Sequence, residues 1–436
     1  MSENLRTRLN QYILADGFDI SLDLENSYGS YIVDKATGKK YVDFFTCFAS
    51  MPLGFNHKKL NNTEFKDKIF HAAINKPSIS DLYPEEYFTF IDTFFKLAVP
   101  KEFKHSFFIE GGALAVENAL KVAFDWKTHK VLKRTNEVPN HLKVISFAQA
   151  FHGRSGYTLT LTNTDPVKTM YFPQFDWIRV TNPKLHFPTN VENLDATLLQ
   201  EEECINQIMK AIRDNEDQIA AIIIEPIQAE GGDNHFRNEF LQKLRQIADE
   251  SEILLIFDEV QTGIGITGTW WYFQQTGVTP DIAVFGKKMQ VCGLIATERV
   301  DDIANNVFHT SSRINSTWGG NLVDMIRCTR YLEIIAEENL IENSRLMGDY
   351  LLTEIKTLII EFPILNNARG KGLMCAFDMP LELRKKFINT AFENGLMILT
   401  CGVNSVRFRP QLGISKSEID EGMAIIRKSL IQLTDK

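Results

Sequence analysis

The 436-residue sequence lacks long apolar runs, a basic surplus and paired cysteine motifs. No run approaches the roughly 18 apolar residues of a membrane-spanning helix, and the first residues do not form the apolar stretch of a secretory signal. A formal net charge of −9 leaves no basic excess to neutralise phosphates. These shortages argue against a membrane protein, a secreted protein or a nucleic-acid binder, and they favour a cytoplasmic protein.

Cysteine is scarce and scattered along the chain. None of the six residues forms a Cys-x-x-Cys pair or lies in the Cys/His spacing of a zinc site. We therefore expect reduced thiols in the protein core and no metal centre. The six residues are Cys47, Cys204, Cys292, Cys328, Cys375 and Cys401.

What the sequence does contain is an alternation of short apolar runs and longer helical patterns. This rhythm predicts an α/β domain with a mostly parallel central sheet. The apolar runs are nearly continuous, as expected when helices cover both faces of the sheet. Helical patterns lie between them, for example at 113–126 and 236–251. The predicted strands are His105–Ile109, Lys143–Phe147, Ala220–Ile224, Ile253–Phe257 and Ile282–Phe285.

Three parts of the chain differ in pattern. Residues 1–45 form an N-terminal segment in which a turn-rich piece, Asp34–Lys40, separates two strand-like runs and predicts a hairpin. Residues 46–310 hold the large α/β domain. Residues 311–436 begin with a long helical pattern, from about Leu322 to Glu337, and continue as a mixed segment. We expect an interdomain helix and a smaller C-terminal α+β domain there.

Candidate functional residues follow the predicted strands, and ligands bind at the carboxyl ends of strands in open α/β sheets. The first group is Gly111, Gly112 and Ala113, between a strand and a helix. Glycines let the backbone pass close to a ligand, and a helix N-terminus offers free N–H groups and a positive dipole end to a phosphate. The same two glycines would also suit a plain tight turn.

Two further strand ends carry acids and an amine. Asp258 and Glu259 follow one apolar strand, where a carboxylate suits either a ligand or a helix cap or salt bridge. Lys287 follows the next strand and a glycine. Lysine is rarely buried without a task, and a desolvated amine loses its proton more easily, as a Schiff-base lysine requires. The alternative is a lysine that reaches solvent from the strand end.

A fourth group, Phe151, His152 and Arg154, follows another predicted strand. The ring of Phe151 can stack on a planar ligand, and the guanidinium of Arg154 suits a carboxylate. For His152 a hydrogen-bonded structural role is favoured over metal ligation.

Together these groups match the needs of one cofactor, pyridoxal 5'-phosphate. It has a phosphate, a ring nitrogen that needs an acid, an aldehyde that needs an amine, and a flat face. The motif Ile256–Gly263, followed by Asp281-Ile282 and Gly286-Lys287, resembles the signature of the class III (ω-) aminotransferases. The resemblance covers nearly the whole chain and implies fold type I of the pyridoxal-phosphate enzymes, with a large α/β domain, a small α+β domain and active sites at a homodimer interface.

The resemblance also implies roles for the residues that match the cofactor site. Lys287 would be the Schiff-base lysine, and Asp258 would pair with the pyridine nitrogen. Thr317, in Asn315-Ser316-Thr317-Trp318, would reach the phosphate across the dimer interface. The other cofactor contacts would be Gly112, Ala113, Phe151, Val260 and Gln261.

For the substrates, the resemblance implies an exchange of partners. Glu230 would pair with Arg407 while the amino donor is bound. It would then swing away, so that Arg407 could grip the α-carboxylate of glutamate or 2-oxoglutarate. Arg154 would bind the far carboxylate in both half-reactions, through the bidentate geometry that suits arginine.

Two features depart from many relatives. The chain has two adjacent lysines, Lys287 and Lys288, and it has Lys288–Gly293 where many relatives have a glycine-rich stretch after the lysine. Counting from Asp281 favours Lys287, and Lys288 is the alternative. Three segments resemble one branch of the family, the lysine 6-aminotransferases: Gly286–Gly293, Asn315–Asn321 and Gly372–Phe377.

This branch implies transfer of the ε-amino group of L-lysine to 2-oxoglutarate. Three alternatives remain open on the sequence. Ornithine or 4-aminobutyrate could be the amino donor, the same fold could serve an aminomutase or racemase, or the chain could be a non-catalytic binding protein.

Overall fold

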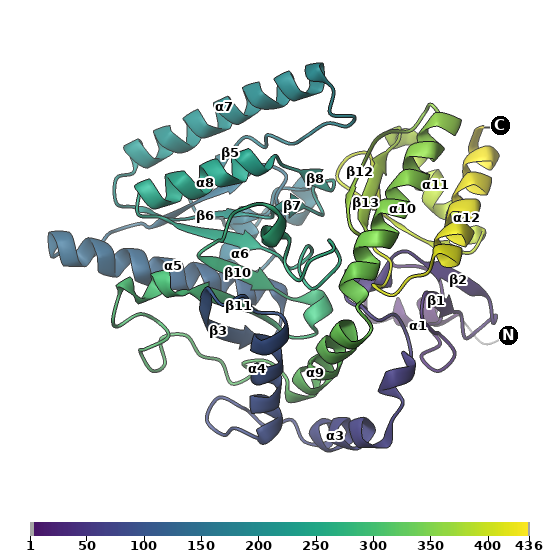
Figure 1. The fold of residues 1–436 in the computed structure, drawn as a ribbon, viewed down its shortest axis with the longest axis horizontal. Coiled ribbons are helices and arrows are strands. Elements are labelled where there is room, and N and C mark those ends of the chain that lie inside the picture. The colour runs from purple at the N-terminus through teal and green to yellow at the C-terminus, as the bar shows by residue number, and fades with distance from the viewer. Residues whose placement is uncertain (1–3, 435–436) are drawn as a thin grey trace.

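A seven-stranded sheet forms the centre of the computed structural model, which describes residues 4–434 (Figure 1). One strand, β11, runs antiparallel to both neighbours, and the other adjacent pairs are parallel. All five predicted strands are confirmed to within two residues. In sheet order the strands are β3 (Phe103–Ile109), β11 (Cys292–Thr297), β10 (Ile282–Phe285), β9 (Leu254–Asp258), β6 (Ile219–Ile224), β4 (Lys143–Phe147) and β5 (Ile178–Val180).

Helices cover both faces of this sheet, as the continuous apolar strands predict. In β9, β10 and the last four residues of β6, alternate residues belong to two separate apolar clusters. One cluster includes α5 (Gly112–Thr135), and the other includes α8 (Asn238–Glu250) and part of α7 (Val191–Asp214). In Figure 1, α7 and α8 lie above β6.

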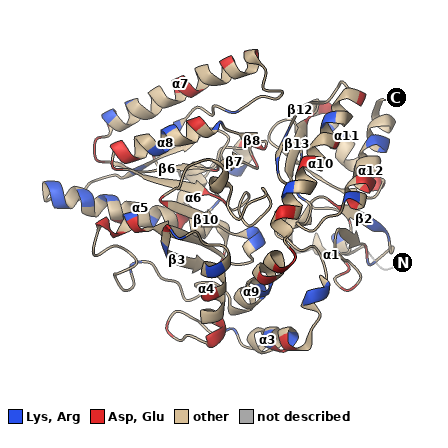
Figure 2. Cartoon of the chain, in the orientation of Figure 1, with Lys and Arg blue, Asp and Glu red and all other residues tan. Residues whose placement is uncertain are grey.

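The long helix α5 points its N-terminus at the carboxyl end of β3 and continues past the predicted end at residue 126. Its last turns are polar and carry Lys133 and Arg134, the blue outer end of α5 in Figure 2. These cations complement the negative end of the helix dipole. The extension was missed because residues 127–135 are mostly polar and show no apolar periodicity. Asn136 ends the helix in the left-handed conformation, with φ of 60°.

The N-terminal hairpin is confirmed. Strand β1 (Tyr31–Val33) pairs antiparallel with β2 (Lys40–Asp43), and β14 (Leu396–Met397) joins β2 in parallel. The N-terminal segment and the C-terminal part therefore share one small sheet. The domain limits at residues 45 and 310 stay a prediction.

The C-terminal part is the expected smaller α+β domain. It begins with α9 (Leu322–Glu337), whose limits match the prediction. A four-stranded antiparallel sheet follows, packed against three helices. The strands, in sheet order, are β12 (Asn366–Lys371), β13 (Met374–Asp378), β16 (Ser405–Phe408) and β15 (Leu399–Cys401), and the helices are α10 (Leu340–Glu361), α11 (Leu381–Glu393) and α12 (Lys416–Thr434).

Shorter elements connect these layers. A two-stranded hairpin, β7 (Ile227–Gln228) and β8 (Asn234–His235), follows β6. No helix among residues 4–434 is both long and apolar enough to cross a membrane. The other helices are α1 (Leu5–Leu9), α2 (Thr46–Ala49), α3 (Thr63–Ile74), α4 (Glu85–Leu97) and α6 (Gly156–Leu161), with 3-10 turns η1 (Lys58–Leu60), η2 (Pro166–Lys168), η3 (Tyr272–Gln275), η4 (Lys287–Met289) and η5 (Glu298–Asp302).

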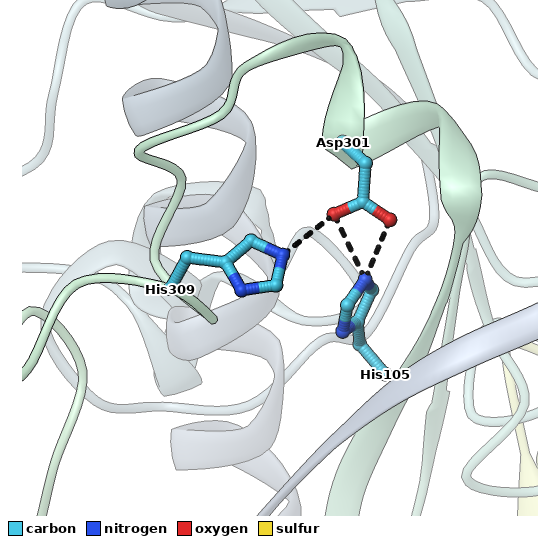
Figure 3. Close-up of side chains that lie close together, drawn as sticks. All are labelled: His105, Asp301 and His309. Carbon is cyan, nitrogen blue, oxygen red and sulfur yellow. Dashed lines mark hydrogen bonds and ion pairs between the residues drawn. The ribbon is translucent and has the colours of Figure 1, made fainter.

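A cluster of His105, Asp301 and His309 ties η5 and the loop after it to the edge strand β3 (Figure 3). The Nε2 atoms of both histidines lie within hydrogen-bond distance of the Asp301 carboxylate, at 2.9 and 3.1 Å. Asn306 Nδ2 donates a further bond to Asp301 at 3.0 Å. The Asp301 carboxylate is thus a shared hydrogen-bond partner of both imidazoles.

Candidate active site

A cavity of about 570 Å³ opens at the carboxyl ends of β9 and β10. Every residue to which the sequence resemblance assigned a cofactor or substrate role lines it, except Thr317. The cavity has two ends with different chemistry. We define the cofactor end by Lys287, Asp258 and the N-terminus of α5, and the carboxylate end by Glu230, Arg407 and Arg154.

At the cofactor end, Asp258 is the last residue of the buried strand β9 and is 5% exposed. Its Oδ2 lies 2.8 Å from Nδ1 of the buried His152, and its Oδ1 accepts a hydrogen bond from the Val260 N–H at 3.1 Å. A carboxylate held on both oxygens keeps one orientation. His152 is hydrogen-bonded, as expected, but its partner is the candidate catalytic acid, which the sequence did not indicate.

Lys287 lies on the same cavity, one strand away. Since β10 pairs in parallel with β9, with Val284 opposite Asp258, the two side chains leave the same edge of the sheet. Desolvation lowers the pKa of Lys287, against the opposing effect of Asp258. Its φ of 49° is left-handed, a conformation that costs about 1–3 kcal/mol and persists only where the surroundings impose it.

The amine of the neighbouring Lys288 forms a hydrogen bond outside the cavity. It is 2% exposed, its Nζ donates to the Gln261 carbonyl at 2.7 Å, and it does not line the cavity. The geometry therefore favours Lys287 as the reactive lysine. Glu259 is likewise turned away, because its carboxylate accepts bonds from the Thr262 hydroxyl and from the backbone N–H groups of Tyr272 and Phe273.

The N-terminus of α5 offers the backbone N–H groups that were predicted to bind an anion. Gly111 has φ of 101° and no side chain caps the helix, so its first N–H groups lack a helical partner. Gly112 and Ala113 line the cavity. Gly153 packs so closely against this turn that a Cβ on it would lie 2.5 Å from the Cβ of Ala113. Only glycine fits there.

Phe151 forms part of the cavity wall and is fixed by a residue that the sequence analysis did not single out. The buried Glu225 accepts hydrogen bonds from the backbone N–H groups of Phe151 and Ala229, at 2.8 and 3.1 Å. Burial raises the pKa of Glu225 to about 7, although His152 opposes this shift. Through these two hydrogen bonds, Glu225 connects the backbone at Phe151 to the loop that contains Glu230.

At the carboxylate end, Glu230 Oε2 pairs with Arg407 Nη2 at 3.0 Å. Arg407 is 4% exposed, and its Nε and Nη1 atoms have no hydrogen-bond partner among the described residues. A buried guanidinium with two free donors has unmet capacity for an anion, and a carboxylate fits its geometry.

Two more cations line this end. Arg154 is exposed, and no described residue pairs with its guanidinium. Lys168, which the sequence analysis missed, places its Nζ 2.8 Å from Glu230 Oε1. Burial raises the pKa of Glu230, but Arg407 and Lys168 more than offset this, and the net shift is downward.

A left-handed turn at Thr46–Ala49 closes another side of the cavity. These four residues have φ between 41° and 64°, a conformation rare outside glycine. The buried Asp43 accepts bonds from the N–H groups of Phe45 and Thr46, and the Thr46 hydroxyl donates to the Arg409 carbonyl at 2.6 Å. The turn brings Cys47 and Phe48 to the cavity, and Gln261 donates weakly to the Phe48 carbonyl at 3.5 Å.

Thr317 lies outside this cavity. It is exposed, in the loop that leads into α9. The Nζ of Lys76, just after α3, lies 4.6 Å from the ring of the adjacent Trp318. The Thr317 loop therefore lies against the α3–α4 region.

The cofactor end fits pyridoxal phosphate. The unpaired amine of Lys287 suits an aldehyde, Asp258 suits a protonated ring nitrogen, the free N–H groups of α5 suit a phosphate, and Phe151 offers a ring face. No described side chain forms a hydrogen bond with the Lys287 amine, so this amine is free to react with a ligand.

Comparisons with known proteins also indicate an enzyme that uses pyridoxal phosphate. The sequence matches the class-III aminotransferase family over residues 14–430. It is 47% identical to an L-lysine-epsilon aminotransferase of Mycobacterium tuberculosis (98% of this chain, 95% of the relative) and 44% identical to that of Amycolatopsis lactamdurans (98% and 96%). The solved M. tuberculosis lysine aminotransferase, in its internal aldimine form, superposes with a TM-score of 0.96 at 45% identity, covering 99% of both chains. The chain thus belongs to the class-III aminotransferases, fold type I enzymes that use pyridoxal phosphate.

Proposed function

We propose that the protein transfers the ε-amino group of L-lysine to 2-oxoglutarate, giving 2-aminoadipate 6-semialdehyde and L-glutamate. The names of its close relatives support lysine as the donor. The observation that carries the proposal is the Glu230–Arg407 pair, in which Arg407 is buried and keeps two unpaired donors beside the cofactor end. Such a pair suits an enzyme that must accept substrates with and without a carboxylate at one position.

The cofactor end would perform the chemistry. When bound, pyridoxal phosphate supplies an aldehyde that takes up the amino group and a ring that draws electrons from the carbon bearing it. Lys287 would anchor that aldehyde at rest. Once freed, its amine would take the proton from the substrate carbon that bears the amino group. Its lowered pKa supports this role, because more of the amine is neutral. Asp258, oriented by His152, would hold a proton on the ring nitrogen.

The carboxylate end would adapt to two substrates. L-lysine reacts at its terminal amine and presents methylenes near Arg407, so Glu230 would stay on Arg407 and neutralise it. Glutamate carries a carboxylate beside its reacting amine, so Glu230 would leave and Arg407 would bind that carboxylate. Arg154, unpaired at the cavity mouth, would bind the distant carboxylate of either substrate.

A homodimer would complete the site. Several large apolar side chains on and between α3 and α4 are more than half exposed, which is typical of an interface. Because Trp318 contacts Lys76 in the same region, this face would present Thr317 to a partner's phosphate. The exposed side chains are Phe70, Ile74, Leu82, Tyr83 and Phe88.

The compartment would be the cytoplasm. All six cysteines are unpaired, and four of them are buried, as expected of reduced core thiols.

A panel of amino donors with 2-oxoglutarate tests the proposed reaction. L-Lysine should give semialdehyde and glutamate in equal amounts, and ornithine and 4-aminobutyrate should give lower kcat/KM. A higher kcat/KM for either of those donors would reassign the substrate. Product formed from lysine without any keto acid would instead indicate an aminomutase, since a mutase returns the amino group to the same carbon skeleton.

A further inference from the structure

Lys168 is a cation of the cavity wall that no motif indicates. It ends the 3-10 turn η2, whose first turn is fixed by Asp165, since the Asp165 side chain accepts from the Val167 N–H at 3.0 Å. Its Nζ lies 3.1 Å from the Thr164 hydroxyl and 5.3 Å from the centre of the Phe151 ring. These contacts hold the ammonium group against the carboxylate end.

Glu230 consequently has two cationic partners, one on each oxygen. Oε1 lies 2.8 Å from Lys168 Nζ, and Oε2 lies 3.0 Å from Arg407 Nη2. Glu230 can therefore lose one partner and keep the other. Arg407, by contrast, has no described acidic partner besides Glu230.

The charges around Glu230 differ between the two half-reactions. With L-lysine bound, Arg407, Lys168 and Glu230 carry two positive charges and one negative charge. With glutamate or 2-oxoglutarate bound, the substrate carboxylate would pair with Arg407, and Lys168 would pair with Glu230. All four charges would then be matched. A released Glu230 without Lys168 would be a half-buried carboxylate with no partner, which is unfavourable.

We propose that Lys168 is a positioning residue that retains Glu230 when it leaves Arg407, and that it thereby favours the dicarboxylate half-reaction over the lysine half-reaction. This inference rests on the exchange at Arg407 described under the proposed function. Lys168 acts through Glu230 and contacts neither substrate. A lysine that only anchored the loop at 162–170 would affect both half-reactions alike.

The test compares Lys168→Met with Lys168→Arg in the holoenzyme, with each half-reaction followed separately through the cofactor absorbance. Loss of a charge-assisted contact predicts a roughly 10-fold lower kcat/KM for glutamate in Lys168→Met. The value for L-lysine should stay within about twofold, because Glu230 stays on Arg407 there. Lys168→Arg should restore most of the glutamate value. Equal losses for both substrates, or no loss for glutamate, would overturn the proposal.

A binding measurement adds a readout independent of turnover. Glutarate, a dicarboxylate without an amino group, should bind the Lys168→Met holoenzyme roughly 10-fold more weakly by calorimetry. In a Glu230→Ala background, Lys168→Met should have no further effect on glutarate, because nothing remains for Lys168 to retain. An equal effect in both backgrounds would mean that Lys168 binds the ligand directly, contrary to the proposal.

The two hypotheses fail in different ways. If Glu230→Ala harms both half-reactions equally, the exchange itself is wrong. If Glu230→Ala shows the expected bias and Lys168→Met shows none, only the role of Lys168 is wrong.

Discussion

The two ends of the cavity are built differently. At the cofactor end, Asp258 and Lys287 follow adjacent parallel strands, and Gly112 begins a 24-residue helix. At the carboxylate end, Arg407 lies in strand β16, but Glu230 lies in the loop between β7 and β8, and Lys168 ends the short 3-10 turn η2. Asp258 is 5% exposed, whereas the Glu230 side chain is 32% exposed and shares its carboxylate between two cations.

This difference corresponds to what each end must do. The cofactor keeps one position through both half-reactions, so its contacts can come from the sheet and α5. The substrates alternate, so the contacts at the other end must be exchangeable. Residues on rigid elements hold geometry more accurately than residues on loops, and a partly exposed carboxylate such as Glu230 can change partners at a lower cost than a fully buried one.

The largest effect should follow from Lys287→Ala, which removes the base at the rigid end. Turnover should fall by roughly 10⁴-fold, while the protein keeps its fold and still binds pyridoxal phosphate through the helix N-terminus and Asp258. Stopped-flow and steady-state assays of both half-reactions measure the loss.

Lys288→Met is the matched control, because Lys288 is buried beside the site without lining it. Borohydride should fix the cofactor to Lys287 in the wild type and in this variant. Label on Lys288 would shift the assignment by one residue.

Asp258→Asn should lower turnover by roughly 10²–10³-fold in both half-reactions, since a neutral amide cannot stabilise a protonated ring nitrogen in the same way. Folding, followed by circular dichroism, should change far less. Glu259→Gln, which alters the next acid outside the cavity, serves as the control. Wild-type turnover in Asp258→Asn would contradict the role of this carboxylate.

Arg154→Ala should lower kcat/KM by roughly 10–100-fold for both L-lysine and glutamate, because one charge-assisted contact of about 1.5–3 kcal/mol is lost in each case. This loss would separate Arg154 from Glu230 and Arg407, since Arg154 is predicted to bind a carboxylate of both substrates without changing partners. A loss confined to one substrate would place Arg154 among the exchanging residues instead.

The smallest effect concerns acid stability at the hairpin that carries Glu230. Burial, aided by Arg369, Lys371 and Arg409, lowers the pKa of His235 to about 3. Between pH 6.5 and 3 the unfolded chain therefore binds a proton that the folded chain does not, so stability falls as the pH falls. From pH 7.5 to pH 5.5 this group alone should remove about 1.4 kcal/mol of unfolding free energy.

Urea unfolding at the two pH values measures this loss, and His235→Gln should reduce it by that amount. An unchanged pH dependence in the variant would show that His235 is not the acid-sensitive group of the hairpin.

The same comparison explains how far the sequence could predict the site. Asp258, Lys287 and Gly112 each follow an apolar strand, so a local pattern marked them. Lys168 lies in a polar turn without periodicity, and its contact with Glu230 spans 62 residues of sequence. The His152–Asp258 bond spans 106. Contacts of this kind depend on how separate loops meet, which no local pattern encodes.

The elements of the fold also differ in how far the sequence predicts them. The five strands and α9 were predictable because burial on both faces leaves a continuous apolar signal. The left-handed turn at Thr46–Ala49 was not, because none of its four residues is glycine. Two bonds from Thr46 hold the turn: its N–H donates to the nearby Asp43 carboxylate, and its hydroxyl donates to the distant Arg409 carbonyl.

The most direct test of an exchangeable carboxylate end is a single-turnover measurement of both half-reactions in Glu230→Ala and Arg407→Ala. Glu230→Ala should lose roughly 10–100-fold with L-lysine and less with glutamate, because Arg407 is left unpaired beside an apolar chain. Arg407→Ala should show the opposite bias. Equal losses for both substrates in Glu230→Ala would contradict the exchange.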